Sequence, residues 1–369
     1  MSAVIFTEHA SNNGKKIVQV TLNAEKSLNA LTLEMIEILA PKMKEWQADD
    51  SVACVLLDGA GDKAFCAGGD IRNLYKGMTG DGKEGFCENF FIEEYQLDYA
   101  IHSFTKPFIC WGNGIVMGGG LGLMSGANYR VVTESSRIAM PEVSIGLYPD
   151  VGGTWFLNRM PGRVGLFLGL TASALNAADA RYVGLGDRFV CHDKKALMIE
   201  LLRSCEWDSD LGSLHHGVNT VLRQLEHDSL DALPESQVLK HFDQINALMD
   251  HYELNDIVDG ILTLETDDRW LQKAQAAVKG GSPAAMVMIH HQLLQGRHLS
   301  LKEVFVSELD LSVNCTRAGE FAEGVRALLI DKDGQPGWRF KSLAEVDKDW
   351  IEQLFVSPWQ GQQHPLADL

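Results

Sequence analysis

Two glycine-rich turns and two downstream carboxylates are the residues of this sequence whose types and spacing could do chemistry. The first turn is Cys66-Ala67-Gly68-Gly69-Asp70, and the second is Gly118-Gly119-Gly120; each follows a short apolar run. Glycine lets a backbone approach a ligand closely, and the first N–H groups of a helix have no acceptor within that helix. Such groups bind anions or a developing oxyanion. Glu142 and Asp150, each preceded by proline, are candidate bases, nucleophiles or hydrogen-bond acceptors.

Each of these features also has an ordinary structural explanation. Three glycines before a helix serve close packing as readily as ligand binding. Glu142 alone is typical of a surface acid at a strand end, and Pro149-Asp150 is typical of a turn. Glu94 lies in an acidic, helix-like segment, where a solvated face is the default.

Other patterns in the sequence favour chemistry less. The segment 122–126 has the wrong glycine spacing for a hydrolase nucleophile elbow around Ser125. Gly112 and Gly114 lack the third glycine of a dinucleotide fingerprint. His290-His291 has no cysteine or carboxylate companions at ligand spacing, so we expect no metal site.

The elements that must position these residues follow from hydrophobic periodicity. A strand over 17–22, a helix over 32–47 and a strand over 52–57 predict a β-α-β unit. Shorter units follow through 107–140, and 162–190 predicts a helix pair leading to an edge segment. Beyond about residue 195 the pattern is almost wholly helical, with helices expected over 194–205, 211–226, 234–249, 256–263, 267–279, 282–294, 300–316 and 319–330.

The two turns, in this order and spacing, resemble the crotonase superfamily, also called the enoyl-CoA hydratase/isomerase family. The resemblance implies an α/β fold, a spiral of repeated ββα turns, here with a mainly helical C-terminal region. It also implies an acyl-CoA-binding catalytic core over 1–200 and a helical region over 201–369. The N–H groups of Gly69 and Gly119 would then form the oxyanion hole for a CoA thioester.

Hydratases of that superfamily have two glutamates, and the position of the first is Gly122 in this sequence. Hydration needs one group to activate water and another to protonate carbon, so ordinary hydration is disfavoured. Gly122, Glu142 and the segment 149–153 instead resemble the 3-hydroxyisobutyryl-CoA hydrolases of valine degradation. That resemblance implies thioester hydrolysis, with Glu142 as nucleophile or general base, Asp150 orienting the substrate hydroxyl or water, and Glu94 contacting substrate.

Two alternatives to the hydrolase stay open. One is an enoyl-CoA hydratase or isomerase of the same fold, working with Glu142 alone. The other is a non-catalytic acyl-CoA-binding or assembly protein. Release of free CoA thiol separates the hydrolase from both.

The resemblance also implies which residues bind the CoA part of the substrate. Lys26 and Leu28 lie in a segment similar to the family loop that touches CoA, and the first glycine turn adds Ala67, Gly69, Asp70 and Ile71. Coenzyme A is polyanionic, whereas the chain has a net charge of −18, so local cations such as Lys26 must face the phosphates. We expect no separate cofactor, because coenzyme A is part of the substrate.

Composition narrows the class and the compartment. The 369 residues are 46% hydrophobic and 22% charged, enough for a large core. The acidic balance argues against nucleic acid or an anionic membrane as a partner. Seven scattered cysteines fit a reducing compartment, and residues 1–30 show no targeting or membrane-spanning pattern, so we expect a cytoplasmic protein. The resemblance suggests a homo-oligomer but leaves the oligomeric state open.

Overall fold

The computed structural model describes residues 2–369, which form two compact units, each made of separated segments of the chain. Unit 1 comprises Met1–Gly69, Gln96–Ile138 and Leu175–Leu239, of which Met1 lies outside the described residues. Unit 2 comprises Asp70–Tyr95, Ala139–Ala174 and Lys240–Leu369. The division near residue 200 that the sequence suggested stays a prediction.

A six-stranded sheet is the framework of unit 1, with strand order β1-β2-β3-β5-β7-β9. Its first pair is antiparallel and every later pair is parallel. The strands are β1 (Val4–Ala10), β2 (Lys16–Leu22), β3 (Val52–Gly59), β5 (Phe108–Gly112), β7 (Tyr129–Val132) and β9 (Arg188–Phe189).

The predicted β-α-β unit is confirmed as β2, α1 (Leu33–Ala48) and β3. The Thr32 side chain accepts the Met35 N–H and so caps the start of α1. The sequence pattern missed β1, whose residues are mostly exposed and pair with β2 at the sheet edge. Val4–Ala10 lacks the apolar periodicity by which strands are recognised.

A second, three-stranded sheet in the order β4-β6-β8 holds the two glycine turns. Its strands are β4 (Ala64–Cys66), β6 (Ile115–Met117) and β8 (Arg137–Ala139). Because β4 and β6 are parallel, with Cys66 paired to Val116, both strands end at the same edge. The turns that follow them are therefore neighbours.

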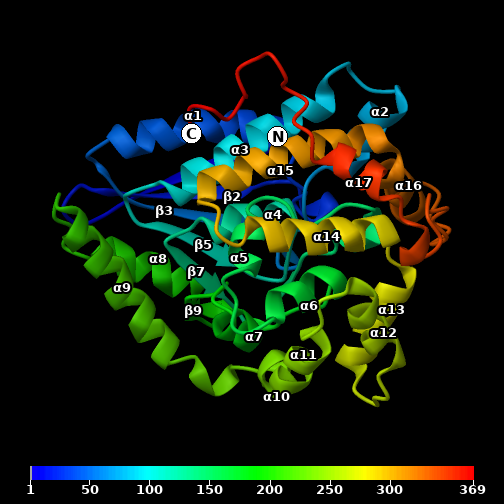
Figure 1. Cartoon of the computed structure of the whole chain (residues 1–369). Helices are drawn as coiled ribbons and strands as arrows, with labels where there is room; N and C mark the ends of the chain where they lie inside the picture. The colour runs from blue at the N-terminus through cyan, green and yellow to red at the C-terminus, as the bar shows by residue number, and fades with distance from the viewer. Residues whose placement is uncertain (1) are drawn as a thin grey trace. The chain divides into compact units, whose positions relative to one another are not determined.

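The two faces of the large sheet pack against different elements. Ile109 and Trp111 of β5 lie in a buried cluster with α8 (Lys195–Ser204) and α9 (Leu211–His227). Figure 1 shows these two helices alongside the strands. Gly112, at the end of β5, lies against the Met124 side chain of α4 (Gly119–Ser125). Unit 1 also contains η1 (Glu25–Ser27), the last part of α3 (Phe86–His102), α7 (Ala177–Tyr182), η3 (His192–Lys194), η4 (Leu230–Ala232) and the start of α10 (Gln237–Lys240).

Unit 2 is helical, and the predicted change to helices beyond residue 195 is confirmed. Its elements are α2 (Ile71–Thr79), the first part of α3 (Phe86–His102), η2 (Glu142–Ile145), α5 (Gly153–Leu157), α6 (Val164–Thr171), α11 (Phe242–Met249), α12 (Leu254–Thr263), α13 (Arg269–Gly280), α14 (Pro283–Gly296), α15 (Leu301–Ala318), α16 (Glu320–Val325), a π-helical turn (Arg326–Ile330), η6 (Leu343–Glu345) and α17 (Lys348–Leu354).

One predicted helix is wrong, since 234–249 divides into α10 and α11. The Val238 N–H and the Ser236 hydroxyl both donate to Asp179 Oδ1, which fixes the start of α10 within unit 1. The chain turns at His241, and α11 belongs to unit 2. A local periodicity cannot report a break that a distant carboxylate fixes.

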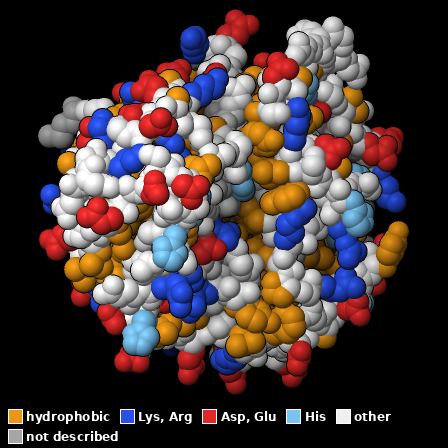
Figure 2. All heavy atoms as spheres, turned by 90° about the vertical axis from the view of Figure 1, so that its left-hand side faces the viewer, with side chains coloured by type: hydrophobic (Ala, Val, Ile, Leu, Met, Phe, Trp, Pro, Cys, Tyr) orange, Lys and Arg blue, Asp and Glu red, His pale blue; other side chains and the backbone are white. Residues whose placement is uncertain are grey.

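Basic side chains lie among the acidic ones on the surface, although the net charge of the chain is −18. On the face drawn in Figure 2, acidic and basic side chains lie interspersed among hydrophobic ones. Within residues 2–369, every helix is too short or too polar to cross a bilayer.

Candidate active site

The first glycine turn lies against the predicted CoA-binding loop in unit 1. The Ala67 N–H donates to Leu28 O at 3.0 Å, and the Leu31 N–H donates to Gly68 O at 2.8 Å. Gly68 has a φ of +115°, a conformation that side chains disfavour. The structure therefore brings the Leu28 and Ala67 segments together; their predicted contact with CoA stays a prediction.

Asn29 is the residue that shapes this loop, and the sequence analysis missed it. Its buried amide donates to Ala60 O and Ala64 O, and its Oδ1 accepts the Ala24 N–H at 3.0 Å. Leu28 and Asn29 both have positive φ, 54° and 55°. Lys26, two residues before Leu28, is exposed, and its contact with CoA stays a prediction.

The second glycine turn begins α4. Gly119 is the first residue of that helix, so its N–H has no acceptor one turn earlier in the helix. Gly120 packs on β4 so closely that an added Cβ would lie 2.3 Å from Cys66 O. An added Cβ on Gly68 would lie 3.4 Å from Met117 O. These contacts hold the two turns side by side, each with backbone near the other.

The helix after this turn carries no carboxylate. Gly122 is buried within α4, a helix whose seven residues are all buried and uncharged. The first glutamate of a hydratase has no counterpart at this position. Asp70 and Ile71, the other predicted CoA-binding residues, begin α2, where Asp70 caps the Asn73 N–H at 3.3 Å.

Unit 2 holds the predicted carboxylates Glu142 and Asp150, each only 5% exposed. Glu142 begins the short helix η2. Among residues 2–369, its Oε2 has no hydrogen-bond partner. Burial, reinforced by the nearby charge of Asp150, raises the pKa of Glu142 well above its ordinary value. A buried carboxyl of this kind becomes a stronger base when it ionises.

Asp150 lies in a strained loop and has a defined partner. Tyr95 Oη donates to Asp150 Oδ2 at 2.7 Å. Burial raises the pKa of Asp150 to about 6, although the Tyr95 hydrogen bond opposes the rise. Val151 and Gly152, which follow, have φ of 53° and 84°. The negative charge of Asp150 in turn raises the pKa of Glu142.

Glu308 holds this loop in place, and the sequence analysis missed it. It is fully buried on α15, where Oε2 accepts the Gly152 N–H at 2.7 Å and Oε1 accepts the Thr154 N–H at 2.9 Å. A signal was present in the sequence. Glu308 and Ser312, four residues apart, occupy the apolar face that Phe305 and Leu309 also share.

Glu94 is buried, not solvated, at 2% exposure on α3. Its neighbour Glu93 is half-buried, and Glu88 pairs with Arg317. The default expectation of a solvated acidic face therefore fails for Glu94. Its predicted substrate contact stays a prediction.

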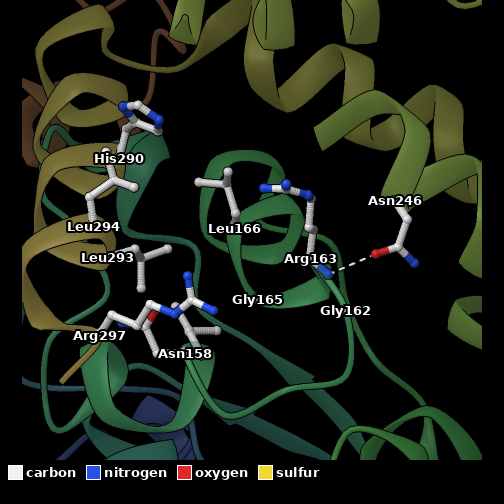
Figure 3. Close-up of a pocket in the computed structure, with 11 residues that line it drawn as sticks. Asn158, Gly162, Arg163, Gly165, Leu166, Asn246, His290, Leu293, Leu294 and Arg297 are labelled. Atoms are coloured by element: carbon white, nitrogen blue, oxygen red, sulfur yellow. Dashed lines mark hydrogen bonds between the residues drawn. The ribbon is translucent and has the colours of Figure 1, made fainter. Parts of the chain in front are cut away.

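A cavity of about 420 Å³ lies elsewhere in unit 2. Figure 3 shows side chains of α14 and of the α6 region facing each other across it, with the Arg163 N–H bonded to Asn246 Oδ1. Its lining includes Leu166, Leu293 and Arg297. Glu94, Glu142 and Asp150 lie outside that lining, so this cavity is separate from the carboxylate pair.

The chain is similar to known proteins over most of its length. A family model described as enoyl-CoA hydratase/isomerase matches residues 17–355. The chain is 39% identical over 340 residues to a 3-hydroxyisobutyryl-CoA hydrolase, mitochondrial, of Danio rerio, covering 92% of this chain and 86% of that protein.

Solved structures match over nearly the whole chain. An enoyl-CoA hydratase from Rhodobacter sphaeroides 2.4.1 has a TM-score of 0.82 and 32% identity, covering 96% of this chain and 97% of that one. A carnitinyl-CoA dehydratase from Mycobacterium thermoresistibile has a TM-score of 0.84 and 31% identity, covering 97% of each chain. The predicted crotonase-like α/β fold is thereby confirmed.

Proposed function

Because this chain belongs to the enoyl-CoA hydratase/isomerase family, we propose that it hydrolyses 3-hydroxyisobutyryl-CoA to 3-hydroxyisobutyrate and CoA. Curated relatives of this name match most of the chain at 35–39% identity. The observation that carries the proposal is which carboxyl groups the predicted site contains. Gly122 replaces one hydratase glutamate, while Glu142 and Asp150 are buried together in unit 2. The proposed biological role is a step of valine catabolism.

The proposed reaction begins at the thioester carbonyl, whose oxygen takes hydrogen bonds from the Gly69 and Gly119 amides as it becomes negative. Removing one such donor typically costs about 3–4 kcal/mol of transition-state stabilisation. In one route, ionised Glu142 attacks the carbonyl carbon, the C–S bond breaks, and CoA leaves as a thiolate that takes up a proton. Water then opens the mixed anhydride.

In the second route, Glu142 removes a proton from water, and that water attacks the carbonyl carbon directly; the C–S bond then breaks, and the leaving CoA thiolate takes up the proton held by Glu142. Asp150 orients the substrate hydroxyl or the water in either route. Both routes need Glu142 ionised, and burial raises its pKa, so we expect the rate to increase with pH until Glu142 is ionised.

Single-turnover hydrolysis in ¹⁸O-labelled water separates the two routes. Direct attack by water places the label in the hydroxy acid in the first turnover. An anhydride leaves label in the Glu142 carboxyl when water attacks the side-chain carbonyl. Mass spectrometry of the peptide that contains Glu142 reads this out.

Glu142→Gln and Asp150→Asn test the proposal through release of CoA thiol from 3-hydroxyisobutyryl-CoA. We expect each to lower kcat by about 10²–10⁴-fold, the range for loss of a positioned acid or base. Glu265→Gln, at an exposed acid, is the matched control and should keep wild-type activity. Undiminished hydrolysis in both site variants would contradict the proposal.

The same-fold alternative is an enoyl-CoA hydratase or isomerase, as the names of the two solved relatives suggest for those proteins. The buried Gly122 weighs against it. Thiol release measured beside loss of the conjugated enoyl absorbance separates the activities. Binding of a CoA thioester without either signal would favour a non-catalytic acyl-CoA-binding or assembly protein.

Location and assembly belong to the proposal as well. The sequence predicts a cytoplasmic protein, whereas the curated relatives are named as mitochondrial. Fractionation of cells that express the chain decides between the cytoplasm and the mitochondrion. A homo-oligomer stays a prediction that sedimentation of the purified protein measures.

A further inference from the structure

A chain of buried hydroxyl groups extends from Asp150 through unit 2. Tyr95 Oη lies 2.7 Å from both Asp150 Oδ2 and Ser312 Oγ. Ser312 Oγ lies 2.8 Å from Tyr148 Oη, which donates to Glu308 O at 2.7 Å. All three hydroxyl-bearing side chains are fully buried. The chain thus joins α3, α15 and the Asp150 loop.

Counting hydrogens shows that this chain depends on the charge of Asp150. It contains four consecutive O···O contacts. Asp150 contacts Tyr95, Tyr95 contacts Ser312, Ser312 contacts Tyr148, and Tyr148 contacts the Glu308 carbonyl. Each hydroxyl supplies one hydrogen. With Asp150 protonated, four hydrogens fill four contacts in one direction, from Asp150 towards the carbonyl.

With Asp150 ionised, only three hydrogens remain for the same four contacts. The Tyr95 hydroxyl then reverses and donates to the carboxylate, which makes the strongest bond because the acceptor is charged. One of the two contacts of Ser312, with Tyr95 or with Tyr148, is then left without a hydrogen. Each charge state of Asp150 therefore has its own direction of hydrogen bonds.

We propose that Tyr95 is the positioning residue of Asp150: backed by Ser312 and Tyr148, its hydroxyl fixes Asp150 Oδ2 and reverses its donor direction as Asp150 gains or loses a proton. The proposal rests on the proposed function only in giving Asp150 a part in hydrolysis. Oδ2 is thereby occupied in both charge states.

Several titratable groups besides Tyr95 face Asp150. Glu142 and Glu308 are carboxyls whose pKa values its negative charge raises. The same charge also raises the pKa values of Tyr148 and of the buried Cys315 thiol. These groups stay in place in the variants below, except where Tyr148 is itself changed.

Tyr95→Phe and Tyr148→Phe test the proposal because each removes one hydroxyl and two contacts, but only Tyr95→Phe removes the hydroxyl that contacts the Asp150 carboxyl. Tyr95→Phe removes the donor to ionised Asp150, so its pKa should rise by about one unit, the difference between a charged and a neutral hydrogen bond. Tyr148→Phe removes two contacts and one hydrogen. Two hydrogens then fill the two remaining contacts of the ionised state, so the pKa should stay or fall.

The readout is ¹³C NMR titration of side-chain carboxyls in the full chain, with the Asp150 signal assigned by its loss in Asp150→Asn. An unshifted titration in Tyr95→Phe, or an upward shift in Tyr148→Phe, would overturn the proposal. Thermal melting of each variant reports any general loss of folding separately.

The same variants distinguish failure of this inference from failure of the proposed function. In thiol-release assays, the pH profile of kcat/KM should shift in Tyr95→Phe in the direction of the NMR shift. In an Asp150→Asn background, Tyr95→Phe should add no further pH shift. If Asp150→Asn and Glu142→Gln both keep full hydrolysis while the NMR shifts appear, the proposed function fails and the positioning role stands. If Asp150→Asn abolishes hydrolysis without NMR shifts, only the positioning role fails.

Discussion

Replacing Glu308 by glutamine tests how the buried loop around Asp150 is held. Glu308 has no exposed surface, and its two carboxylate oxygens accept the Gly152 and Thr154 amides at 2.7 and 2.9 Å. Glutamine has nearly the same shape, so the change creates no cavity. It keeps one acceptor and removes the possibility of a charge.

The magnitude follows from the linkage between protonation and stability. Burial raises the pKa of Glu308 from 4.5 to about 8, although the two amides oppose the rise. Because the folded value is above the unfolded one, the stabilisation is fully present below pH 4.5 and is lost as pH rises towards 8. At about 1.4 kcal/mol per pH unit, the wild-type protein loses roughly 3–4 kcal/mol between pH 5 and 8 through this group.

Urea unfolding of wild type and Glu308→Gln at pH 5, 6, 7 and 8 measures this effect. At pH 5 both side chains are neutral, so the two proteins should differ by only about 1 kcal/mol, one hydrogen bond. Between pH 5 and pH 8, the free energy of unfolding of the variant should rise by about 3 kcal/mol relative to that of wild type, because glutamine does not ionise. Glu265→Gln, at an exposed acid, should follow wild type throughout.

Parallel stability curves for wild type and Glu308→Gln would refute this reasoning. A variant that loses stability relative to wild type as pH rises would also refute it. That result would mean that the two amides, and not burial, decide the charge of Glu308.

Two further predictions concern the glycine turn and the loop of unit 1. Gly120→Ala should lower stability by about 1–3 kcal/mol and lower thiol release, because its Cβ would lie 2.3 Å from Cys66 O and would push the two glycine turns apart; urea unfolding and kcat measure these effects. Asn29→Ala should raise KM more than it lowers kcat, because the amide that ties the predicted CoA loop to Ala60 O and Ala64 O is lost; an unchanged KM would show that the loop keeps its shape without it.

The local elements could be predicted from the sequence because their signals are local. Apolar periodicity located β2, α1 and β3, and glycines marked both turns beside short strands. The replacement at Gly122 was also visible, since a missing carboxylate needs no structure to be noticed. Exposed β1 carried no such periodicity and was missed.

The tertiary structure alone decided which side chains surround the carboxylates. Tyr95 and Ser312 lie 217 positions apart, and Glu308 holds a loop 156 positions away, so neither partnership leaves a repeat in the sequence. The sequence by itself determined the types of group available: two backbone turns, Glu142 and Asp150. Whether these carboxyls are buried, how their pKa values shift and which hydroxyls touch them depends on long-range packing, because desolvation and hydrogen bonding act through space and not along the chain.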